Sequence, residues 1–237
     1  VGRFAYSVAD SAIDTWVDGY VKGTPGRKVS IYNEGCLLAF ILDTKIREAT
    51  HNKSTLQHLM NRLFYAFGLT HIGYSEKDIL SQLQQLSGID FSVLFEQYIN
   101  ASNGYESLLQ EAFSFYGIEL RQEVPAELHK GSLGIKILTK TEKTFIMDIA
   151  SGSPADVGGL AEGDQLVSIN GKEITTNLSE VLSSLKHEVL KLVILRRGEN
   201  IEKTLPLVQR TFYPTMKLIM KETDQYQIKK NRQHFGL

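Results

Sequence analysis

The spacing of apolar positions changes along the chain from a helical period to a period of two. Between residues 30 and 117, apolar side chains recur every three or four positions, and short polar loops separate the runs. The longest run, residues 30–46, opens with Ser30 and Asn33 and then stays almost wholly apolar, which predicts a helix buried on most of its surface. It is too short, and too interrupted by Asp43 and Lys45, to span a bilayer.

Further amphipathic helices are expected on both sides of this run. A short helix at about residues 11–21 carries Trp16, which we interpret as a core or interdomain anchor. Four helices follow the long run, and they are expected to begin near Ser54, Ser75, Asp90 and Gly104. Successive amphipathic helices joined by short loops indicate a compact all-α unit.

From Gly131 onward the pattern is typical of strands. Short apolar runs alternate with turn sequences such as Asn170-Gly171, and one helix is expected at residues 178–186. Residues 118–130 change character and are interpreted as the connection between two domains. The sequence therefore predicts an α+β protein. Its expected parts are a helical domain at 1–120, a linker at 121–130, a β domain at 131–210 and a tail at 211–237 that packs back on the body through Phe235.

Composition removes several classes of function. A net charge of −1 argues against nucleic-acid binding, which needs a clustered basic face. The single cysteine, Cys36, excludes an intramolecular disulfide and is expected to be a small buried apolar residue. No membrane span or signal peptide is visible, and the chain begins without an initiator Met, so we expect a fragment of a longer protein. A cysteine-poor chain suits bacterial cytoplasm and periplasm equally, which leaves the compartment open.

Tyr32 is the candidate catalytic residue. The polar opening of the long helix places it at or just before the first turn, where unpaired backbone N–H groups favour developing negative charge. A phenol fixed there by a buried helix can donate a hydrogen bond to an oxyanion. The plainer interpretation is an amphipathic packing residue at the start of a helix.

The helical half resembles a known family. The segments SVADSAIDTWVDGY (Ser7 to Tyr20) and SIYNEG, followed by the long apolar helix, resemble the C-terminal half of the catalytic domain of the glycyl aminopeptidases. These form family sixty-one of the zinc metallopeptidases, relatives of thermolysin and aminopeptidase N. The segment SGIDFSVLFEQYI at 87–99 resembles a pattern that both groups of aminopeptidases share. The resemblance implies that Tyr32 and Gly35 occupy a Tyr-x-x-Gly motif, in which the tyrosine stands over the zinc-bound tetrahedral intermediate.

The second half resembles a PDZ domain in the permuted arrangement of bacterial protease modules, which implies a peptide-binding groove. The loop at Leu133, Gly134 and Ile135 is expected to converge its amides on a C-terminal carboxylate, and the strand through Lys136 and Ile137 offers an edge for an added strand. The groove helix is expected to supply the other wall through Leu178, Val181, Leu182 and Leu185. The groove is equally open to a scaffold role, or to filling by the chain's own segment.

The chemistry of a zinc peptidase is absent from this sequence. Two His at helical spacing with a Glu between them do not occur, and His51 and His58 are expected to be surface residues. The resemblance implies that the metal ligands lie upstream of Val1, so this chain is expected neither to hold zinc nor to hydrolyse peptides alone. The expected function is the C-terminal part of a zinc-dependent aminopeptidase acting on peptides with small N-terminal residues, Gly or Ala. The alternative is a non-catalytic PDZ adaptor that binds the C-termini of partner proteins, and the sequence that precedes Val1 distinguishes the two.

Overall fold

The computed structural model describes residues 2–18, 29–174, 178–183, 189–206, 208, 211–222 and 225–236. The chain divides into two compact units. The helical unit comprises Val1–Leu120 and Leu218–Leu237, and the β unit comprises Arg121–Lys217. The mixed α+β class expected from the sequence is confirmed, with a helical region followed by a PDZ-like β domain.

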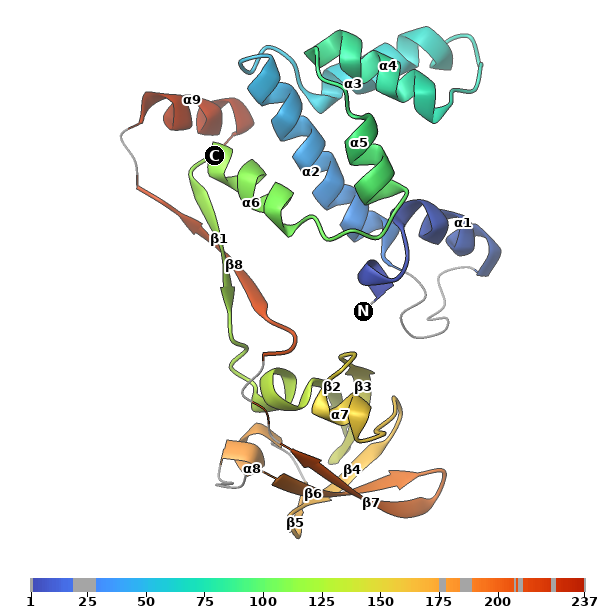
Figure 1. The fold of residues 1–237 in the computed structure, drawn as a ribbon, viewed down its shortest axis with the longest axis vertical. Helices are drawn as coiled ribbons and strands as arrows, with labels where there is room; N and C mark the ends of the chain where they lie inside the picture. The colour runs from blue at the N-terminus through green and yellow to red at the C-terminus, as the bar shows by residue number, and fades with distance from the viewer. Residues whose placement is uncertain are drawn as a thin grey trace. The chain divides into compact units, whose positions relative to one another are not determined.

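The helical unit is organised around α2, Ile31–Ala49, which packs against α1, α3, α4 and α6 (Figure 1). The described helices of this unit are η1 Gly2–Phe4, α1 Val8–Asp18, α3 Leu56–Leu63, η2 Phe64–Gly68, α4 Glu76–Ser87, α5 Ser92–Leu94, η3 Phe95–Ile99, α6 Glu106–Phe115 and α9 Tyr226–Phe235. Leu38, Ile41, Leu42 and Ile46 form one buried stripe of α2, at the spacing of a single helix face. Figure 1 shows α2 in the middle of this unit, and its buried stripe forms part of the hydrophobic core.

Local signals account for where these helices begin and end. Ser75 caps α4, and Asp78 completes a capping box by accepting from the Ser75 amide at 2.8 Å. Gly88 ends the same helix in the left-handed region, at φ 77°. The start of α3 differs from expectation by one residue, because Thr55 rather than Ser54 is the capping residue.

Several apolar residues are more exposed than the sequence predicted. Cys36 is exposed, because it lies about 200° around α2 from Leu38 and therefore on the face opposite the buried stripe. Trp16 is 90% exposed and is not a core residue of this unit. Met60 and Phe64 are apolar positions at helical spacing, yet both are exposed, and Phe64 begins a π-helical turn that shifts the face of the helix.

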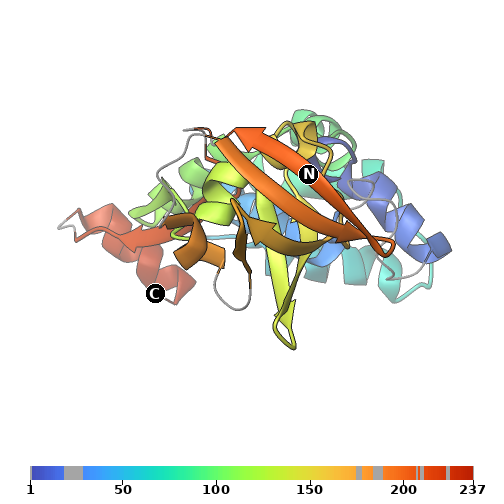
Figure 2. The same ribbon diagram turned by 90° about the horizontal axis from the view of Figure 1, so that it is seen from below.

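The β unit contains an antiparallel sheet with strand order β2-β3-β4-β6-β7, and β5 pairs with β4. The bounds are β2 Ile135–Lys140, β3 Lys143–Ile149, β4 Gln165–Ile169, β5 Lys172–Glu173, β6 Val189–Arg196 and β7 Glu199–Pro206. Figure 2 shows the β6–β7 hairpin in orange and the β2–β3 hairpin in yellow-green. The remaining elements are η4 His129–Leu133, α7 Pro154–Val157 and α8 Leu178–Ser183.

Three two-residue turns connect neighbouring strands of this sheet. Thr141 and Glu142 join β2 to β3, Asn170 and Gly171 join β4 to β5, and Arg197 and Gly198 join β6 to β7. Both central residues of each turn have positive φ, as in type I′ turns, whose twist matches that of antiparallel strands. The Asn170-Gly171 turn predicted from the sequence is confirmed.

Two strands lie outside this sheet. β1, Ile118–Glu123, pairs with β8, Thr215–Met220, and the residues of each strand are shared between the two units. The basic end of the chain, interpreted from the sequence as a polar tail, forms α9. Its Phe235 ring lies 4.7 Å from that of Tyr116 and 5.9 Å from that of Phe40. Among the described helices, none combines the length and apolar character that crossing a bilayer requires.

Candidate active-site tyrosine and peptide groove

Tyr32 lies at the second position of α2. Ser30 precedes the helix with extended backbone angles, φ −72° and ψ 107°, and its Oγ accepts a hydrogen bond from the amide of Asn33 at 3.3 Å. This cap begins the helix where the sequence predicted, and the Tyr32 side chain is 65% exposed. Its phenol is therefore reachable from solvent beside the positive end of the α2 dipole.

Gly35 lies one turn further along α2. A Cβ added to this residue would meet no described atom within 4 Å. Packing against the described residues therefore does not require a glycine at the last position of the Tyr-x-x-Gly motif.

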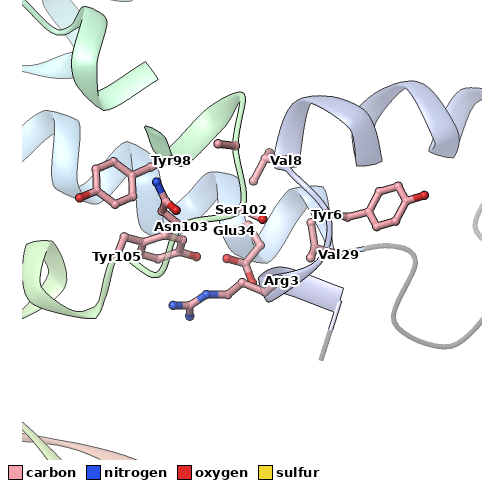
Figure 3. A pocket seen from close by; sticks show the side chains of 10 residues that line it. Arg3, Tyr6, Val8, Val29, Glu34, Tyr98, Ser102, Asn103 and Tyr105 are labelled. Atoms are coloured by element: carbon pink, nitrogen blue, oxygen red, sulfur yellow. The ribbon is translucent and has the colours of Figure 1, made fainter. Parts of the chain in front are cut away.

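A polar hollow adjoins the start of α2 (Figure 3). Figure 3 shows the Glu34 carboxylate and the Tyr105 hydroxyl directed toward the same region as Arg3. The Arg3 guanidinium lies 4.2 Å from the centre of the Tyr105 ring, and its Nη2 is 2.6 Å from Oε1 of Glu106. This last contact is an ion pair without the geometry of an aligned hydrogen bond, since Nη2 lacks a hydrogen-bond partner among the described residues.

Glu34 is the titratable group of this hollow. Its Oε2 and the Tyr105 hydroxyl are buried and have no hydrogen-bond partner among the described residues. Burial raises the pKa of Glu34, and the Glu106 carboxylate raises it further, while Arg3 opposes the shift. This cluster was not predicted from the sequence, because Tyr105 and Glu106 lie far along the chain from Glu34. The available signal was the position of Glu34 near Tyr32.

No metal centre accompanies these residues in the part of the chain that the structure describes. That part contains no cluster of three or more His, Cys, Asp or Glu side chains able to hold a metal ion. His51 and His58 are exposed, and His58 accepts from the Thr55 amide at 3.0 Å through its Nδ1. The described residues therefore do not fit the zinc that the family resemblance implies.

The second candidate site is the edge of the β unit at β2. Among the described strands, β2 pairs only with β3 and ends the strand order, so its outer edge is unpaired there. Leu133 and Ile135 are almost wholly buried in the core of the unit, and Ile137 packs against that core. An unpaired strand edge can accept an extended peptide as an additional strand.

The loop before β2 forms a π-helical turn, His129–Leu133, which ends at Gly134. Gly134 has φ 72°, and its amide donates to the carbonyl oxygen of His129. Its own carbonyl accepts from the Ala150 amide at 2.8 Å. Both backbone polar groups of the central residue in the expected carboxylate loop are thus bonded within the unit.

The other expected groove residues differ in what they expose. The Lys136 side chain is bonded to Asp148 at 3.0 Å and lies over the Tyr213 ring, so it is already engaged within the unit. Leu178 and Leu182 of α8 are buried in the core, and Val181 is partly buried against it. Leu185 lies outside the described residues.

The sequence analysis also missed the support behind this loop. The Phe212 amide donates to the carbonyl oxygen of Gly131 at 3.0 Å, and Phe212 is buried. Tyr213 follows, and burial raises the pKa of its hydroxyl, with Asp148 raising it further. The run Phe212-Tyr213 in an otherwise polar stretch was the available signal.

Comparison with known proteins identifies parts of both units. The profile of the PDZ domain family matches residues 145–196. The chain is similar to the serine protease Do-like HtrA of Bacillus subtilis, with 27% identity over 157 residues that cover 60% of this chain and 32% of that protein. It is also similar to the serine protease HTRA1B of Danio rerio, with 38% identity over 66 residues, 27% of this chain and 14% of that protein. The chain thus spans a third or less of these relatives.

One solved structure shares the fold over almost the whole chain. An aminopeptidase N family protein from Idiomarina loihiensis superposes with a TM-score of 0.81, covering 95% of this chain and 40% of that chain at 22% identity. This likeness concerns the fold. The chain therefore combines a helical region with a PDZ-like domain, and several of the relatives that it matches in sequence are serine proteases.

Proposed function

We propose that this chain is the C-terminal part of a zinc-dependent aminopeptidase that acts on peptides with small N-terminal residues, glycine or alanine. The helical unit contributes a wall of the substrate cleft, and the PDZ-like unit binds a peptide segment. The observation that carries the proposal is Tyr32, an exposed phenol in the first turn of a helix anchored by its buried stripe. The fold shared with an aminopeptidase N family protein supports it.

Tyr32 acts in this proposal as a hydrogen-bond donor. As the carbonyl oxygen of the scissile peptide bond gains negative charge, the phenol O–H donates to it, and the N-terminal end of α2 favours the same charge. Because α2 is fixed by Leu38, Ile41 and Ile46 in the core, the phenol is held by a rigid element. The described residues form no metal cluster, so the zinc of this proposal is bound by side chains outside them.

The exposed face of α1 supports a larger catalytic domain. Ile13, Trp16 and Val17 are all strongly exposed on this one helix, and Trp16 is 90% exposed. Contiguous exposed apolar side chains mark interaction surfaces. Trp16, interpreted from the sequence as a core or interdomain anchor, retains the second of these roles in the proposal. The unmatched length of the aminopeptidase N family protein provides a candidate for the covering segment.

A second candidate function is a non-catalytic adaptor that presents its PDZ-like groove to partner proteins. The PDZ match at residues 145–196 favours it, since that match does not require a catalytic domain.

The two functions are separated by measuring zinc and activity together. Zinc content is determined by plasma mass spectrometry for this chain and for the gene product extended at its N-terminus, with glycyl-anilide hydrolysis measured on both. The aminopeptidase proposal predicts zinc and hydrolysis in the extended protein alone. Their absence from both proteins contradicts it and favours the adaptor.

A further inference from the structure

We infer that the PDZ-like groove binds an internal, extended segment of a polypeptide by strand pairing with β2 and does not depend on a free C-terminal carboxylate. The inference rests on the proposed peptide-binding role of the groove and specifies the class of ligand. It replaces the carboxylate-binding loop expected at Leu133, Gly134 and Ile135 with recognition along the strand.

The central amide of the expected loop, that of Gly134, is already bonded within the unit. A carboxylate would have to displace the His129 carbonyl oxygen from the Gly134 amide, since that amide already donates to it. Neighbouring residues also oppose a rotation of the Gly134 backbone that would release this amide. A Cβ on Gly134 would lie 2.3 Å from the Cβ of Ser153, and the Phe212 amide holds Gly131 by its carbonyl oxygen. The turn is thus packed in the closed conformation.

The charges around the loop do not favour an anion. Residues 127–138, all described, contain three basic side chains, and each is engaged or buried. Lys130 pairs with Glu127 at 2.6 Å, and Lys136 pairs with Asp148 at 3.0 Å. His129 is buried, and its burial together with Lys130 lowers its pKa, which keeps the imidazole neutral at pH 7. A carboxylate would therefore lose its hydration without gaining a cation from this stretch.

The edge of β2, in contrast, is arranged to receive a strand. Lys140 and Lys143 close the type I′ turn as a hydrogen-bonded pair, and bonding alternates from there as far as Ile137, before the register shift at Lys136. Leu138 consequently bonds toward β3. The N–H and C=O groups of Ile137 and Thr139 point to the outer edge, where no described strand pairs with them.

Selection from two peptide libraries tests the inference on the purified chain. One phage library displays random heptamers with free C-termini, and the other embeds the same heptamers between polar linkers so that no free carboxylate is near. We expect binders from the embedded library. The synthetic peptide of the best binder should keep its Kd within threefold as free acid, as amide and with a C-terminal extension.

Two results separate this inference from peptide binding itself. Binders from the free C-terminal library alone, or a tenfold loss of affinity on amidation, would overturn the inference and leave peptide binding intact. An absence of binders from both libraries would overturn both.

Matched proline variants test the strand edge. Ile137→Pro removes an N–H that faces outward from β2 and should weaken the selected peptide at least tenfold. Glu202→Pro removes an outward N–H from β7, the strand at the other end of the sheet. This variant should bind the selected peptide with an affinity within twofold of the unmodified chain. Thr139→Pro replaces Ile137→Pro if circular dichroism shows that the latter does not fold. Binding by these β2 variants at the level of the unmodified chain would overturn the inference.

The state of the loop is tested with a free carboxylate alone. Titration with N-acetyl-valine should leave the amide resonance of Gly134 unshifted in the ¹⁵N-labelled chain, because that amide remains bonded to His129. A saturable shift of this resonance would show that a carboxylate displaces the His129 carbonyl and would overturn the inference.

Discussion

The guanidinium of Arg232 in α9 donates from Nε to the carbonyl oxygen of Tyr116, the C-cap residue of α6, at 2.7 Å. Its Nη2 also donates to the carbonyl oxygens of Gly117, at 3.1 Å, and Lys221, at 2.8 Å. One side chain therefore donates to three backbone carbonyl groups, of which that of Gly117 also accepts from the Lys221 amide at 3.0 Å. Arg232 fixes the last helix of the chain to the end of α6 within the helical unit.

Arg232→Ala should destabilise the helical unit by about 2 kcal/mol. Hydrogen bonds to a charged group contribute roughly 1.5–3 kcal/mol, and water replaces them only partly at this half-buried position. Urea unfolding followed by circular dichroism measures the change. Lys230→Ala, two positions earlier on α9, is the matched control and should change stability by less than about 0.5 kcal/mol. Equal effects of the two substitutions would show that helix content, not the Arg232 contacts, accounts for the loss.

The Asp164–Arg196 pair should be important to the β unit. Asp164 is 1% exposed, and Arg196 donates to both of its carboxylate oxygens at 2.7 Å and to the carbonyl of Gly159 at 2.9 Å. Arg196→Ala leaves the buried carboxylate without its cation, which should cost about 3 kcal/mol. Denaturant unfolding measures this, with Lys191→Ala on the same strand as control. A loss below about 1 kcal/mol would mean that Asp164 finds water or another donor.

Gly134 should tolerate substitution less than Gly152, although both have positive φ, 72° and 69°. A Cβ on Gly152 meets nothing within 4 Å, so Gly152→Ala should cost only the backbone strain, about 1 kcal/mol. A Cβ on Gly134 lies 2.3 Å from that of Ser153, so Gly134→Ala must in addition move the loop or α7. Thermal unfolding of the two variants should differ by several degrees, and similar melting temperatures would contradict the close packing behind the loop.

Glu34 should make stability depend on pH. Burial raises its folded-state pKa above the unfolded value of about 4.5, so the folded state binds more protons between these two values. The stability that the folded state gains by binding this proton is therefore fully present below about pH 4.5. It is lost as pH rises through the folded-state pKa of Glu34. Glu34→Gln should remove this pH dependence. Its effect on the free energy of unfolding should therefore be more stabilising at pH 7 than at pH 4. Parallel urea titrations at the two pH values measure the difference, and an unchanged pH dependence would mean that Glu34 is solvated.

The fold was predictable where local pattern and packing agree. The buried stripe of α2 and the cap at Ser30 follow from spacing and residue type, and they locate Tyr32 correctly at the start of the helix. The exposure of Cys36 was not predictable, because an apolar run does not tell which face meets the core. The π-helical turn at 64–68 was equally hidden, since its sequence continues the α-helical pattern of α3.

The candidate sites were likewise predictable only in part. The strand through Ile135 and Ile137 followed from alternation and turn sequences, and its edge position was implied by the resemblance to a PDZ domain. The closure of the preceding loop did not, because it depends on a backbone hydrogen bond from Gly134 to His129 that no residue type encodes. The hollow around Glu34 required long-range packing against Tyr105.

The most direct test of the proposed function is kcat of Tyr32→Phe in the whole protein that contains this chain, measured on a glycyl-anilide. Loss of one donor to a developing oxyanion lowers kcat by roughly 10²–10³-fold, and the substitution should leave KM and folding nearly unchanged. Tyr65→Phe is the matched control, because Tyr65 is 68% exposed and Tyr32 is 65% exposed in the same unit. The account predicts a loss of this size for Tyr32→Phe alone. A kcat within threefold of the unmodified enzyme would remove Tyr32 from the mechanism.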